Sequence, residues 1–428
     1  MKIAFIVNEF PSLSQTFVLN QITGLIDRGH EVDIFPQERG THGKVHEDIR
    51  KYNLLARTSY PVVPSQNIIR RYCDALRHIG PLLMKNPRAI FHSLNFLKYG
   101  RKASSLTLLY TIIPFLDKGP YDIVHCHFGP CGQLGALLKE LTVTKGKLLT
   151  TFHGYDMSRY LKKYGRHAYD SLFTQGDLFL PISEHWKNKL IELGCPPEKI
   201  VIHRMGIDTA KFTFPARKPK MNDKVQFLSI GRLVEKKGFQ YSIRAVATIR
   251  ETFPNIEYTI IGEGPLRRSL ESLIDELHVG DCVHLLGWMR QDELVQALTD
   301  ADILLAPSVT SHNGDQEGIP VALMEALALG LPVISTLHSG IPELIQDRKT
   351  GLLVPERDVD ALSNKLKYVL LNQEYWAQAA KAGRKYVEEN HEINKLNDQL
   401  VHVFLGLTTD SPMSPRHSTE PAPIKAQA

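Results

Sequence analysis

The chain has 428 residues, of which 43% are hydrophobic and 23% are charged, a composition typical of a globular protein long enough for two domains. Its 51 basic and 46 acidic residues leave a net charge of +5, which is too small over this length to indicate nucleic-acid binding. No run of about 18 apolar residues predicts a membrane-spanning helix, and five cysteines without a C-x-x-C pair favour a reduced, cytosolic compartment.

Short apolar runs alternate with helical patterns along almost the whole chain, and these runs predict buried parallel strands. They read KIAFIVN, EVDIFP, DIVHCHF, KLLTTFHG, DLFLPIS and KIVIHRMG in the first half, and VQFLSIG, EYTIIGEG, CVHLLGW, DILLAPS, LPVIST and TGLLVP in the second. Helices between successive strands complete right-handed crossovers. The pattern therefore predicts two doubly wound α/β domains.

The segment from residue 66 to residue 118 is both basic and apolar, with almost no acidic residues. Arginines and lysines stand at positions 70, 71, 77, 85, 88, 98, 101 and 102 among Ile, Leu and Phe. One interpretation is a helical insertion that packs on the first domain and has a solvated basic face. The other is an amphipathic surface that lies on an anionic membrane or meets a lipid acceptor.

Three histidines stand at the ends of predicted strands. His125 and His127, in VHCHFG, share one face of a strand because side chains alternate with a period of two. We interpret them as a polar strand end on the acceptor side, with a simple packing role as the alternative. His153 ends a strand and precedes Gly154, so it can face the cleft, although a lone histidine is more often structural.

Composition also places the domain boundaries. Residues 212–223, FTFPARKPKMND, are rich in Pro, Lys and Arg and poor in apolar residues, which is typical of a linker. The first domain is therefore expected over 1–211 and the second over 224–385. A helix over 386–407 is expected to return to the first domain, and residues 408–428 are expected to form a disordered tail.

In the second domain, SIGRLVEKKGF follows one strand and precedes a helix. Gly231 and Gly238 bracket Arg232, Lys236 and Lys237, which places the cations at the carboxyl end of a parallel strand, where such sheets bind ligands. Arginine offers forked contacts to phosphate oxygens, and lysine offers a point charge. The alternative is an ordinary solvated loop.

The stretch APSVTSHNGDQEGIPVALMEA predicts a strand end, a polar loop and an apolar helix with Pro320 at its first position. The free N–H groups at such a helix start form an anion site. Glu317 lies at its lip, and Glu325 lies about two turns inside the helix. A buried carboxylate needs partners, so we expect Glu325 to bind a vicinal diol such as ribose or, alternatively, a Lys or Arg.

Asp300 and Asp302 form a D-x-D pattern, which in other proteins holds a metal and a nucleotide sugar. Here the pattern stands at the amino end of a strand, opposite the expected ligand edge, and capping is the favoured interpretation. No H-x-x-H, C-x-x-C or P-loop pattern occurs, so neither a metal nor a cofactor is expected.

Taken together, GRLVEKKG, EGIPVALME, GLPVIST, GIPELI and TGLLVP resemble the retaining family 4 glycosyltransferases, over about residues 1–400. NEFPSLSQTFVLNQI, TFHGYD and GDQEGIPVALMEA are more narrowly similar to the glycosyltransferases of colanic acid and amylovoran exopolysaccharide biosynthesis. The resemblance implies the GT-B architecture, in which two doubly wound, Rossmann-like domains face a cleft.

By position, the resemblance implies roles for individual residues. Arg232 and Lys237 would hold the donor diphosphate, Glu325 would hold the ribose hydroxyls, and Glu317 and His153 would contact the donor sugar. The donor-binding set is Gly231, Arg232, Lys237, Gly262, Gly264, Glu317, Gly318, Ile319, Val321 and Glu325, and the catalytic set is His153, Glu317, Lys237 and Arg232. The acceptor side would carry Ser14, Gln15, Thr16, His127 and Asp156. The first three stand where many relatives have a Gly-Gly loop, so they either replace the contacts of that loop or serve the acceptor.

The expected reaction is transfer of a hexose from a UDP- or GDP-sugar to a carbohydrate or polyprenyl-linked acceptor, with retention and without a metal. Because Glu317 and Glu325 are assigned to binding, we expect a front-face attack in which the donor phosphate takes the acceptor's proton. The expected location is the cytoplasm, at the inner face of the membrane if the basic segment binds lipid, and no nucleic acid is expected. Alternatives are a nucleotide-sugar epimerase, a phosphorylase, or a non-catalytic scaffold that binds a nucleotide.

Overall fold

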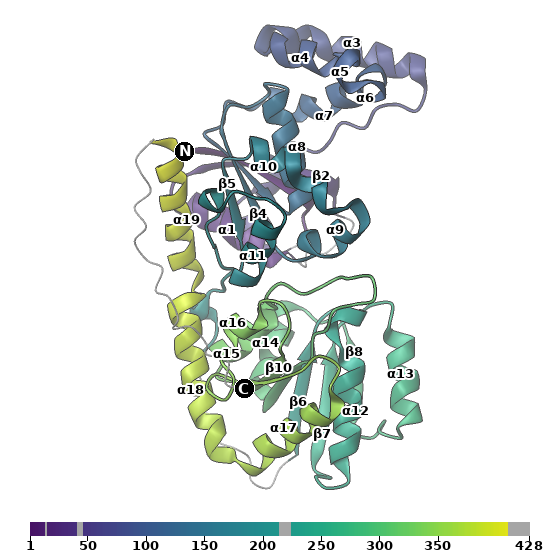
Figure 1. Cartoon of the computed structure of the whole chain (residues 1–428), viewed down its shortest axis with the longest axis vertical. Coiled ribbons are helices and arrows are strands. Elements are labelled where there is room, and N and C mark those ends of the chain that lie inside the picture. Colours follow the sequence, from purple (N-terminus) through teal and green to yellow (C-terminus); the bar gives the residue numbers. More distant parts are fainter. Residues whose placement is uncertain (13–14, 41–45, 214–223, 410–428) are drawn as a thin grey trace.

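The computed structural model describes residues 1–12, 15–40, 46–213 and 224–409. Two parallel sheets form the centres of two α/β domains, which lie one above the other along the long axis of the molecule (Figure 1). The prediction of two doubly wound domains is thus confirmed. Ser14, most of the expected linker and the expected tail from residue 410 onward lie outside the described residues.

The first sheet has the strand order β2-β1-β3-β4-β5, and its pairings are parallel. The strands are β1 (Lys2–Phe10), β2 (Glu31–Arg39), β3 (Ile123–His127), β4 (Lys147–Phe152) and β5 (Leu178–Pro181). The chain winds from β1 to β2 on one side and through β3 to β5 on the other, so the topological switch point lies between β1 and β3. Ligands of such sheets bind at the carboxyl edge beside this point.

The second sheet has the order β11-β10-β9-β6-β7-β8 and is also parallel. The strands are β6 (Val225–Ile230), β7 (Ile256–Ile261), β8 (Val283–Gly287), β9 (Ile303–Ala306), β10 (Val333–Thr336) and β11 (Leu352–Val354). Its switch point lies between β6 and β9.

The helices of the first domain cover both faces of its sheet or project beyond it (Figure 1). They are α1 (Thr16–Asp27), α2 (Glu47–Lys51), α3 (Ile68–Lys85), α4 (Pro87–Ser93), α5 (Phe96–Tyr99), α6 (Arg101–Ser104), α7 (Thr107–Leu116), α8 (Gly129–Glu140), α9 (Arg159–Tyr164), α10 (Asp170–Gln175) and α11 (Glu184–Glu192). Successive residues of β1 serve opposite faces. Phe5 belongs to a core cluster with Ile22 of α1 and Leu400, whereas Ile6 belongs to a cluster with Ile112 of α7 and Leu138 of α8.

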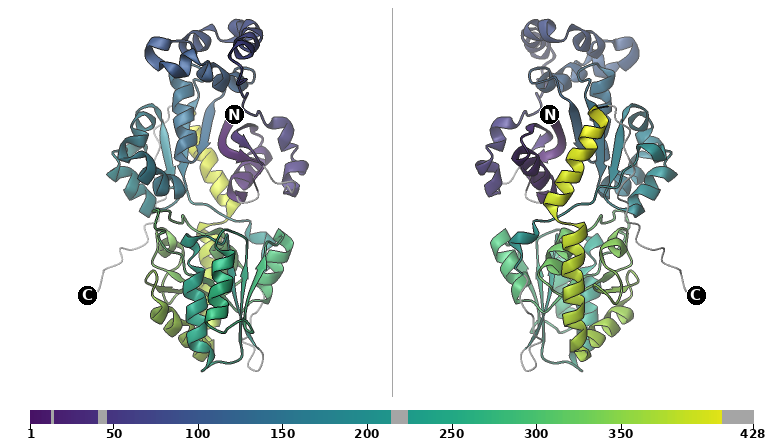
Figure 2. Two further views of the ribbon diagram at one scale, coloured as in Figure 1. Left: turned by 90° about the vertical axis from the view of Figure 1, so that its right-hand side faces the viewer. Right: turned by 90° about the vertical axis from the view of Figure 1, so that its left-hand side faces the viewer.

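Helices α3 to α6 project beyond the first sheet and form one tip of the molecule, far from the second domain (Figures 1 and 2). Helix α7 links this tip to the domain core, because its Leu109, Ile112 and Ile113 are buried. Among the described helices, none is both long enough and apolar enough to span a membrane.

The second domain contains α12 (Phe239–Arg250), α13 (Arg267–Glu276), α14 (Gln291–Asp300), α15 (Val321–Ala328), α16 (Ile341–Leu344), α17 (Val359–Leu371) and α18 (Gln373–Asn390), followed by α19 (Ile393–Thr408). Short 3-10 helices cover Leu54–Arg57, Tyr155–Met157, Arg166–Tyr169, Pro197–Lys199, Thr209–Lys211 and Glu235–Lys237. A separate core cluster fills one side of this domain, with Phe227, Ile243 and Leu366 among its fully buried members.

The last two helices join the domains. Helix α18 packs on α15 in the second domain, and α19 packs on α1 in the first, so the two helices run along both domains (Figure 2). The returning helix begins later than expected, at Ile393 rather than at residue 386. The chain turns at His391, and the Glu392 carboxylate then accepts the Lys395 N–H at 2.9 Å as the N-cap of α19.

One predicted strand is wrong. Residues 199–206, KIVIHRMG, form no strand, although Val201 N donates to Phe179 O and His203 N donates to Pro181 O. After these two bonds to the edge strand β5, the chain bends away, and Ile207 N donates instead to His391 O. The segment therefore connects the sheet to the turn between α18 and α19.

Candidate active site

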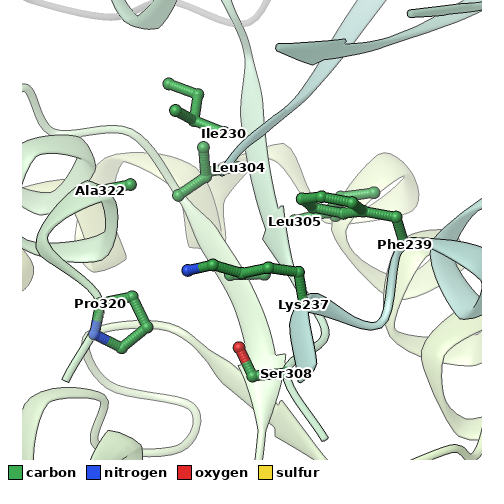
Figure 3. A pocket seen from close by; sticks show the side chains of 9 residues that line it. Ile230, Lys237, Phe239, Leu304, Leu305, Ser308, Pro320 and Ala322 are labelled. Carbon is green, nitrogen blue, oxygen red and sulfur yellow. The ribbon is translucent and has the colours of Figure 1, made fainter. Parts of the chain in front are cut away.

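The carboxyl edge of the second sheet gathers the predicted donor-binding residues at the switch point between β6 and β9. Strand β6 leads through Gly231 into the 3-10 turn Glu235–Lys237. Lys237 lines a small cavity of about 10 Å³ together with Ser308, which follows β9, and Pro320. In Figure 3 the Lys237 ammonium points toward Pro320, at the start of α15.

Two turns meet closely at this edge. A Cβ atom on Gly262 would lie 1.9 Å from the Gly231 carbonyl oxygen, and the Gly262 φ of +147° also disfavours other residues. Leu233 N donates to Glu263 O at 2.9 Å, so the 262–264 turn is bonded to the loop that carries the cations. The structure thus places Gly262 and Gly264 beside that loop, and their contact with a nucleotide stays a prediction.

Glu317 forms a charge cluster with both lysines of the Glu235–Lys237 turn. Its carboxylate lies 3.2 Å from Lys237 Nζ and 3.9 Å from Lys236 Nζ. Lys236 also pairs with Asp315 at 3.2 Å. Burial favours the neutral acid, but the two ammonium groups outweigh it and lower the pKa of Glu317 to about 2. Glu317 is therefore ionised at neutral pH, and its carboxylate holds both lysines close together.

His338 positions the loop that carries Glu317, and the sequence analysis missed it. The Glu317 N–H donates to His338 Nε2 at 3.0 Å, and His338 Nδ1 lies 2.6 Å from Glu356 Oε1. Because Nε2 accepts, Nδ1 carries the proton and faces the carboxylate. The signal was present in the sequence, since His338 follows β10 at the same carboxyl edge.

The helix after Glu317 begins one residue later than expected. Helix α15 starts at Val321, and Pro320 is its N-cap rather than its first helical residue. The Pro320 ψ of 126° is extended, as is usual for an N-cap, so the proline ends the loop instead of entering the helix. Gly318, Ile319 and Val321 all surround this helix start, as the prediction of a phosphate site requires.

Glu325 lies inside α15 without a cation. Its carboxylate accepts a weak hydrogen bond from Gln291 Nε2 at 3.4 Å, and no Lys or Arg pairs with it in the part of the chain that the structure describes. Loss of solvent raises the pKa of Glu325, and the Gln291 contact only partly opposes this. The alternative in which a Lys or Arg satisfies Glu325 is therefore wrong among the described residues, and its carboxylate is available to a ligand.

Arg232 differs from the lysines because it is exposed. Within the described ranges, no carboxylate pairs with its guanidinium, so the group is free to meet an anion. The cations of this edge are thus of two kinds: two held in a buried cluster and one that reaches outward.

The carboxyl edge of the first sheet carries buried histidines instead of charges. His153 Nε2 lies 3.0 Å from His127 Nδ1, and their rings stack with centroids 5.2 Å apart. Burial lowers the pKa of His153 to about 3 and that of His127 well below its usual value, so both rings are neutral. In the described structure, His153 Nδ1 is buried without a hydrogen-bond partner, as expected of an atom that meets a substrate hydroxyl.

His127 and Asp156 do not reach the surface of this edge. Both are fully buried, and Asp156 accepts N–H groups from Gly129, His153 and Gly154 at 2.9 to 3.0 Å. Asp156 thus fixes the backbone of His153 and of the loop that follows it, and His127 contacts the His153 ring, so an acceptor-side role of either residue stays a prediction.

The remaining acceptor-side residues lie near His153. Thr16 opens α1 and Phe17 follows it, with its ring centroid 4.6 Å from that of His153. Gln15 precedes the helix, and its Oε1 is buried without a hydrogen-bond partner among the described residues. Gln15 and Thr16 are thus placed to approach a ligand at His153, whereas Ser14 lies outside the described residues.

The two edges touch one another. A Cβ atom on Gly318 would lie 2.2 Å from the His153 carbonyl oxygen, so only glycine permits this contact. The domains also meet through Glu343 of α16, whose carboxylate accepts the N–H groups of Glu184 and His185, each at 2.9 Å, at the start of α11. The predicted cation loop and the predicted histidine therefore belong to one site.

An apolar cavity of about 250 Å³ lies beside the acceptor side of the first domain. It is lined by Phe35 of β2, Tyr110 and Phe115 of α7, and Leu134 of α8. Gly129, at the start of α8, donates to Asp156. Leu134 stands five residues further along, a rise of roughly 7 Å, so the cavity lies close to the histidine edge.

The D-x-D pattern lies away from this site. The Asp302 carboxylate accepts the Gln226 N–H at 2.8 Å, at the amino end of β6, which agrees with a capping role. Among the described residues, no three His, Cys, Asp or Glu side chains are grouped as metal ligands. Whether the reaction needs a metal stays a prediction.

Comparisons with known proteins place the chain in a family. Residues 14–211 match the model of glycosyltransferase family 4, and residues 211–386 match that of glycosyl transferases group 1. A putative colanic acid biosynthesis glycosyltransferase of Escherichia coli is 39% identical over 95% of this chain and 100% of its own length. An amylovoran biosynthesis glycosyltransferase of Erwinia amylovora is 42% identical over 85% of this chain and 89% of its own.

The fold has a counterpart among solved structures. The Anabaena protein HepE, solved in complex with UDP and glucose, superposes with a TM-score of 0.68 over 94% of this chain and 99% of its own, at 15% identity. At that identity the likeness supports the fold alone, and the fold is the GT-B architecture. The chain therefore belongs to the family of glycosyltransferases that includes the colanic acid and amylovoran biosynthesis enzymes.

Proposed function

We propose that this glycosyltransferase moves a hexose from a UDP- or GDP-sugar to a lipid-linked glycan, with retention of anomeric configuration and without a metal, in cytoplasmic exopolysaccharide biosynthesis. The observation that carries the proposal is the meeting of the Lys236–Lys237–Glu317 cluster with neutral His153 at two facing carboxyl edges. The names of the Escherichia coli and Erwinia amylovora relatives support the biosynthetic context.

The charge cluster supports a diphosphate as the donor's leaving group. Lys237 lies at the start of α15, where backbone N–H groups and the helix dipole favour anions, and exposed Arg232 is free to close on the same phosphates. As the bond to the sugar breaks, negative charge grows on the diphosphate, and these cations stabilise it. Cations in this position supply the charge that a metal ion provides in other transferases.

The carboxylates of the site support front-face attack. Glu317 is engaged by two ammonium groups and Asp156 by three N–H donors, so neither is free to act as a nucleophile. In the proposed step, the bond from the sugar anomeric carbon to the phosphate oxygen breaks, and the acceptor oxygen bonds to the same face of that carbon. The acceptor proton passes to a phosphate oxygen of the departing diphosphate. Neutral His153 orients the sugar through Nδ1.

The apolar cavity supports a lipid-linked acceptor over a free glycan. Leu134 of α8 lines the cavity, and Gly129 at the start of the same helix donates to Asp156. The cavity walls also include Phe35, Tyr110 and Phe115. An apolar cavity of this kind receives a hydrocarbon chain with a gain in free energy that grows with the buried area. A free polysaccharide would leave it unfilled.

The first experiment is thermal unfolding of the pure protein with UDP, GDP and their sugars. A ligand at about 100 times its Kd adds roughly 2.7 kcal/mol to stability. We expect one base to stabilise the wild type and to lose most of this effect with Glu325→Ala. Glu276→Ala, at an exposed position at the end of α13, is the matched control and should respond like the wild type. No stabilisation by any nucleotide would exclude the proposed function.

Transfer is then measured with the stabilising donor. When the sugar of the donor is labelled, the label should pass into the lipid fraction of a membrane extract. NMR of the product should show that the transferred sugar keeps the anomeric configuration that it had in the donor. Conversion of the sugar without an acceptor would indicate an epimerase, and a requirement for orthophosphate would indicate a phosphorylase. Binding of the donor without turnover, whichever acceptor is supplied, would indicate a non-catalytic scaffold.

A further inference from the structure

We propose that helices α3 to α6 form a docking surface for an anionic lipid bilayer. The inference goes beyond the proposed reaction, because it concerns a surface at the opposite tip of the first domain from the charge cluster and holds for any donor sugar (Figure 1). It decides between the two interpretations of the basic segment that the sequence left open.

The net positive charge of the protein is concentrated in this segment. Residues 66–118 contain nine basic and two acidic residues, a net charge of +7, whereas the whole chain carries +5. The rest of the chain is therefore slightly acidic. A local field of this size attracts an anionic surface within about a Debye length, roughly 8 to 10 Å at moderate salt.

Part of this charge is used within the protein, and part is free. Arg70 and Arg77 pair with Asp74, Lys85 pairs with Asp117, and Lys98 pairs with Glu140. These pairs fit the interpretation of a packed insertion. In contrast, Arg88, Arg101 and Lys102 are exposed, and none of them has a carboxylate partner in the described part of the chain. Three cations are thus left for an external anion.

Large apolar side chains are exposed on the same helices. Of nineteen large exposed hydrophobic residues in the described structure, eight lie on α3 to α5, which make up less than a tenth of the chain. Leu97 is 90% exposed, Met84 is 87% exposed and Leu76 is 70% exposed. Such a concentration is unusual for a solvated surface and typical of an interaction site.

Helix α3 separates its protein-facing residues from these exposed ones. Ala75 and Leu82 are buried against the domain, whereas Ile68, Tyr72 and Leu76, spaced by four residues, form an exposed apolar stripe. Exposed apolar groups interleaved with free cations match the chemistry of a bilayer with anionic headgroups, whose interior takes the apolar side chains. A protein partner would need acidic and apolar residues at positions that match these cations and apolar side chains one by one. A bilayer needs no such match, because its headgroups and acyl chains are fluid.

The fold places this surface where a bilayer can reach it. Helices α3 to α6 form one tip of the molecule, away from the second domain (Figure 2). The next helix of the same segment, α7, lines the apolar cavity beside the histidine edge. A membrane held against α3 to α6 would therefore lie close to α7, which packs on these helices and lines the proposed acceptor cavity.

The test is cosedimentation of the full chain with vesicles of phosphatidylcholine, with or without phosphatidylglycerol, in the absence of any nucleotide sugar. We expect binding to the anionic vesicles that weakens as salt rises. Arg88→Ala/Arg101→Ala/Lys102→Ala should weaken it by roughly a hundredfold, because each cation near a charged surface contributes about fivefold. Leu76→Glu/Leu97→Glu should weaken it by roughly tenfold or more, because it places two charges among the apolar contacts.

The matched control is Leu371→Glu, which places the same charge at an apolar position that is 71% exposed on α17 of the other domain. We expect this variant to bind like the wild type. Unchanged unfolding midpoints confirm that the variants fold, since all the substituted side chains are exposed. The proposal is overturned if the wild type binds neither kind of vesicle, if both multiple variants bind like the wild type, or if Leu371→Glu weakens binding equally. Because no donor is present, these results do not depend on transferase activity.

Discussion

The two sheets meet edge to edge, yet their edges have opposite electrostatic character. The second sheet presents Lys236, Lys237 and Glu317, which form ion pairs with one another. The first sheet presents His127 and His153, both neutral, above a carboxylate that is satisfied by backbone N–H groups. Both sheets are doubly wound and parallel, so the difference comes from side chains and not from topology.

This comparison indicates how one fold serves two kinds of ligand. An edge with positive charge suits a diphosphate, whose negative charge rises during the reaction. An edge with buried neutral rings suits hydroxyl groups, which need a hydrogen bond but no compensating charge. The predictions below test whether the neutrality of one edge and the charge of the other are both required.

The largest expected effect concerns the neutral edge and pH. Burial lowers the pKa of His153 to about 3 and that of His203 to about 4, from 6.5 in the unfolded chain. The unfolded state therefore takes up protons first as pH falls below about 6.5, and stability is lost. At pH 5.5 each histidine costs about 1 kcal/mol, and burial of His125 and His127 adds to this. Urea unfolding at pH 7.5 and 5.5 measures the loss.

A variant identifies the groups responsible for this loss. His153→Gln removes one titrating ring, so its stability difference between pH 7.5 and 5.5 should be about 1 kcal/mol smaller than that of the wild type. Equal stability of the wild type at the two pH values would show that these histidines are protonated in the folded protein, and the neutral edge would have to be abandoned.

The next effect concerns Lys237 on the charged edge. Lys237→Met should lower turnover by roughly 100- to 1,000-fold, because it removes a cation that stabilises charge in the transition state. Glu317 keeps Lys236 as a partner, so stability should change much less than turnover. Initial rates with saturating donor measure the effect, and Lys381→Met, at an exposed position on α18, is the control. Near-normal turnover by folded Lys237→Met would remove this lysine from the catalytic set.

Local patterns in the sequence predict much of this site, and contacts between distant segments account for what they miss. Apolar runs located the strands, and the residues that follow them, such as Lys237 and His153, do lie at carboxyl edges. The apolar run at 199–206 was predicted as a strand, but it forms only two backbone hydrogen bonds with the edge strand β5 before the chain bends away. The burial of Asp156 and the His338 support of Glu317 depend on loops brought together from separate strands, which no local pattern encodes.

Glu325 offers a smaller test of the charged edge. It is a carboxylate with raised pKa and one weak hydrogen bond, which is costly unless a ligand uses it. Glu325→Gln should weaken binding of the nucleotide by roughly tenfold, since it replaces a charged acceptor with a neutral one. The free protein should lose no stability and gain up to about 1 kcal/mol. Calorimetric titration and thermal unfolding measure the two effects, and a loss of both binding and stability would indicate a structural role.

The smallest expected effect concerns Glu343, a carboxylate of the second domain that accepts hydrogen bonds from backbone N–H groups of the first domain. Its carboxylate accepts the N–H groups of Glu184 and His185 at the start of α11, where the helix dipole favours a negative charge. Glu343→Gln keeps one acceptor but removes the charge, so this contact should weaken by about 0.3 to 1 kcal/mol. Amide hydrogen exchange at these two residues should become up to about fivefold faster, while exchange in the middle of α11 stays unchanged. Unchanged exchange at both amides would show that the contact between the domains does not depend on the charge of Glu343. The Lys237–Glu317 cluster would then be the remaining charged feature of the comparison.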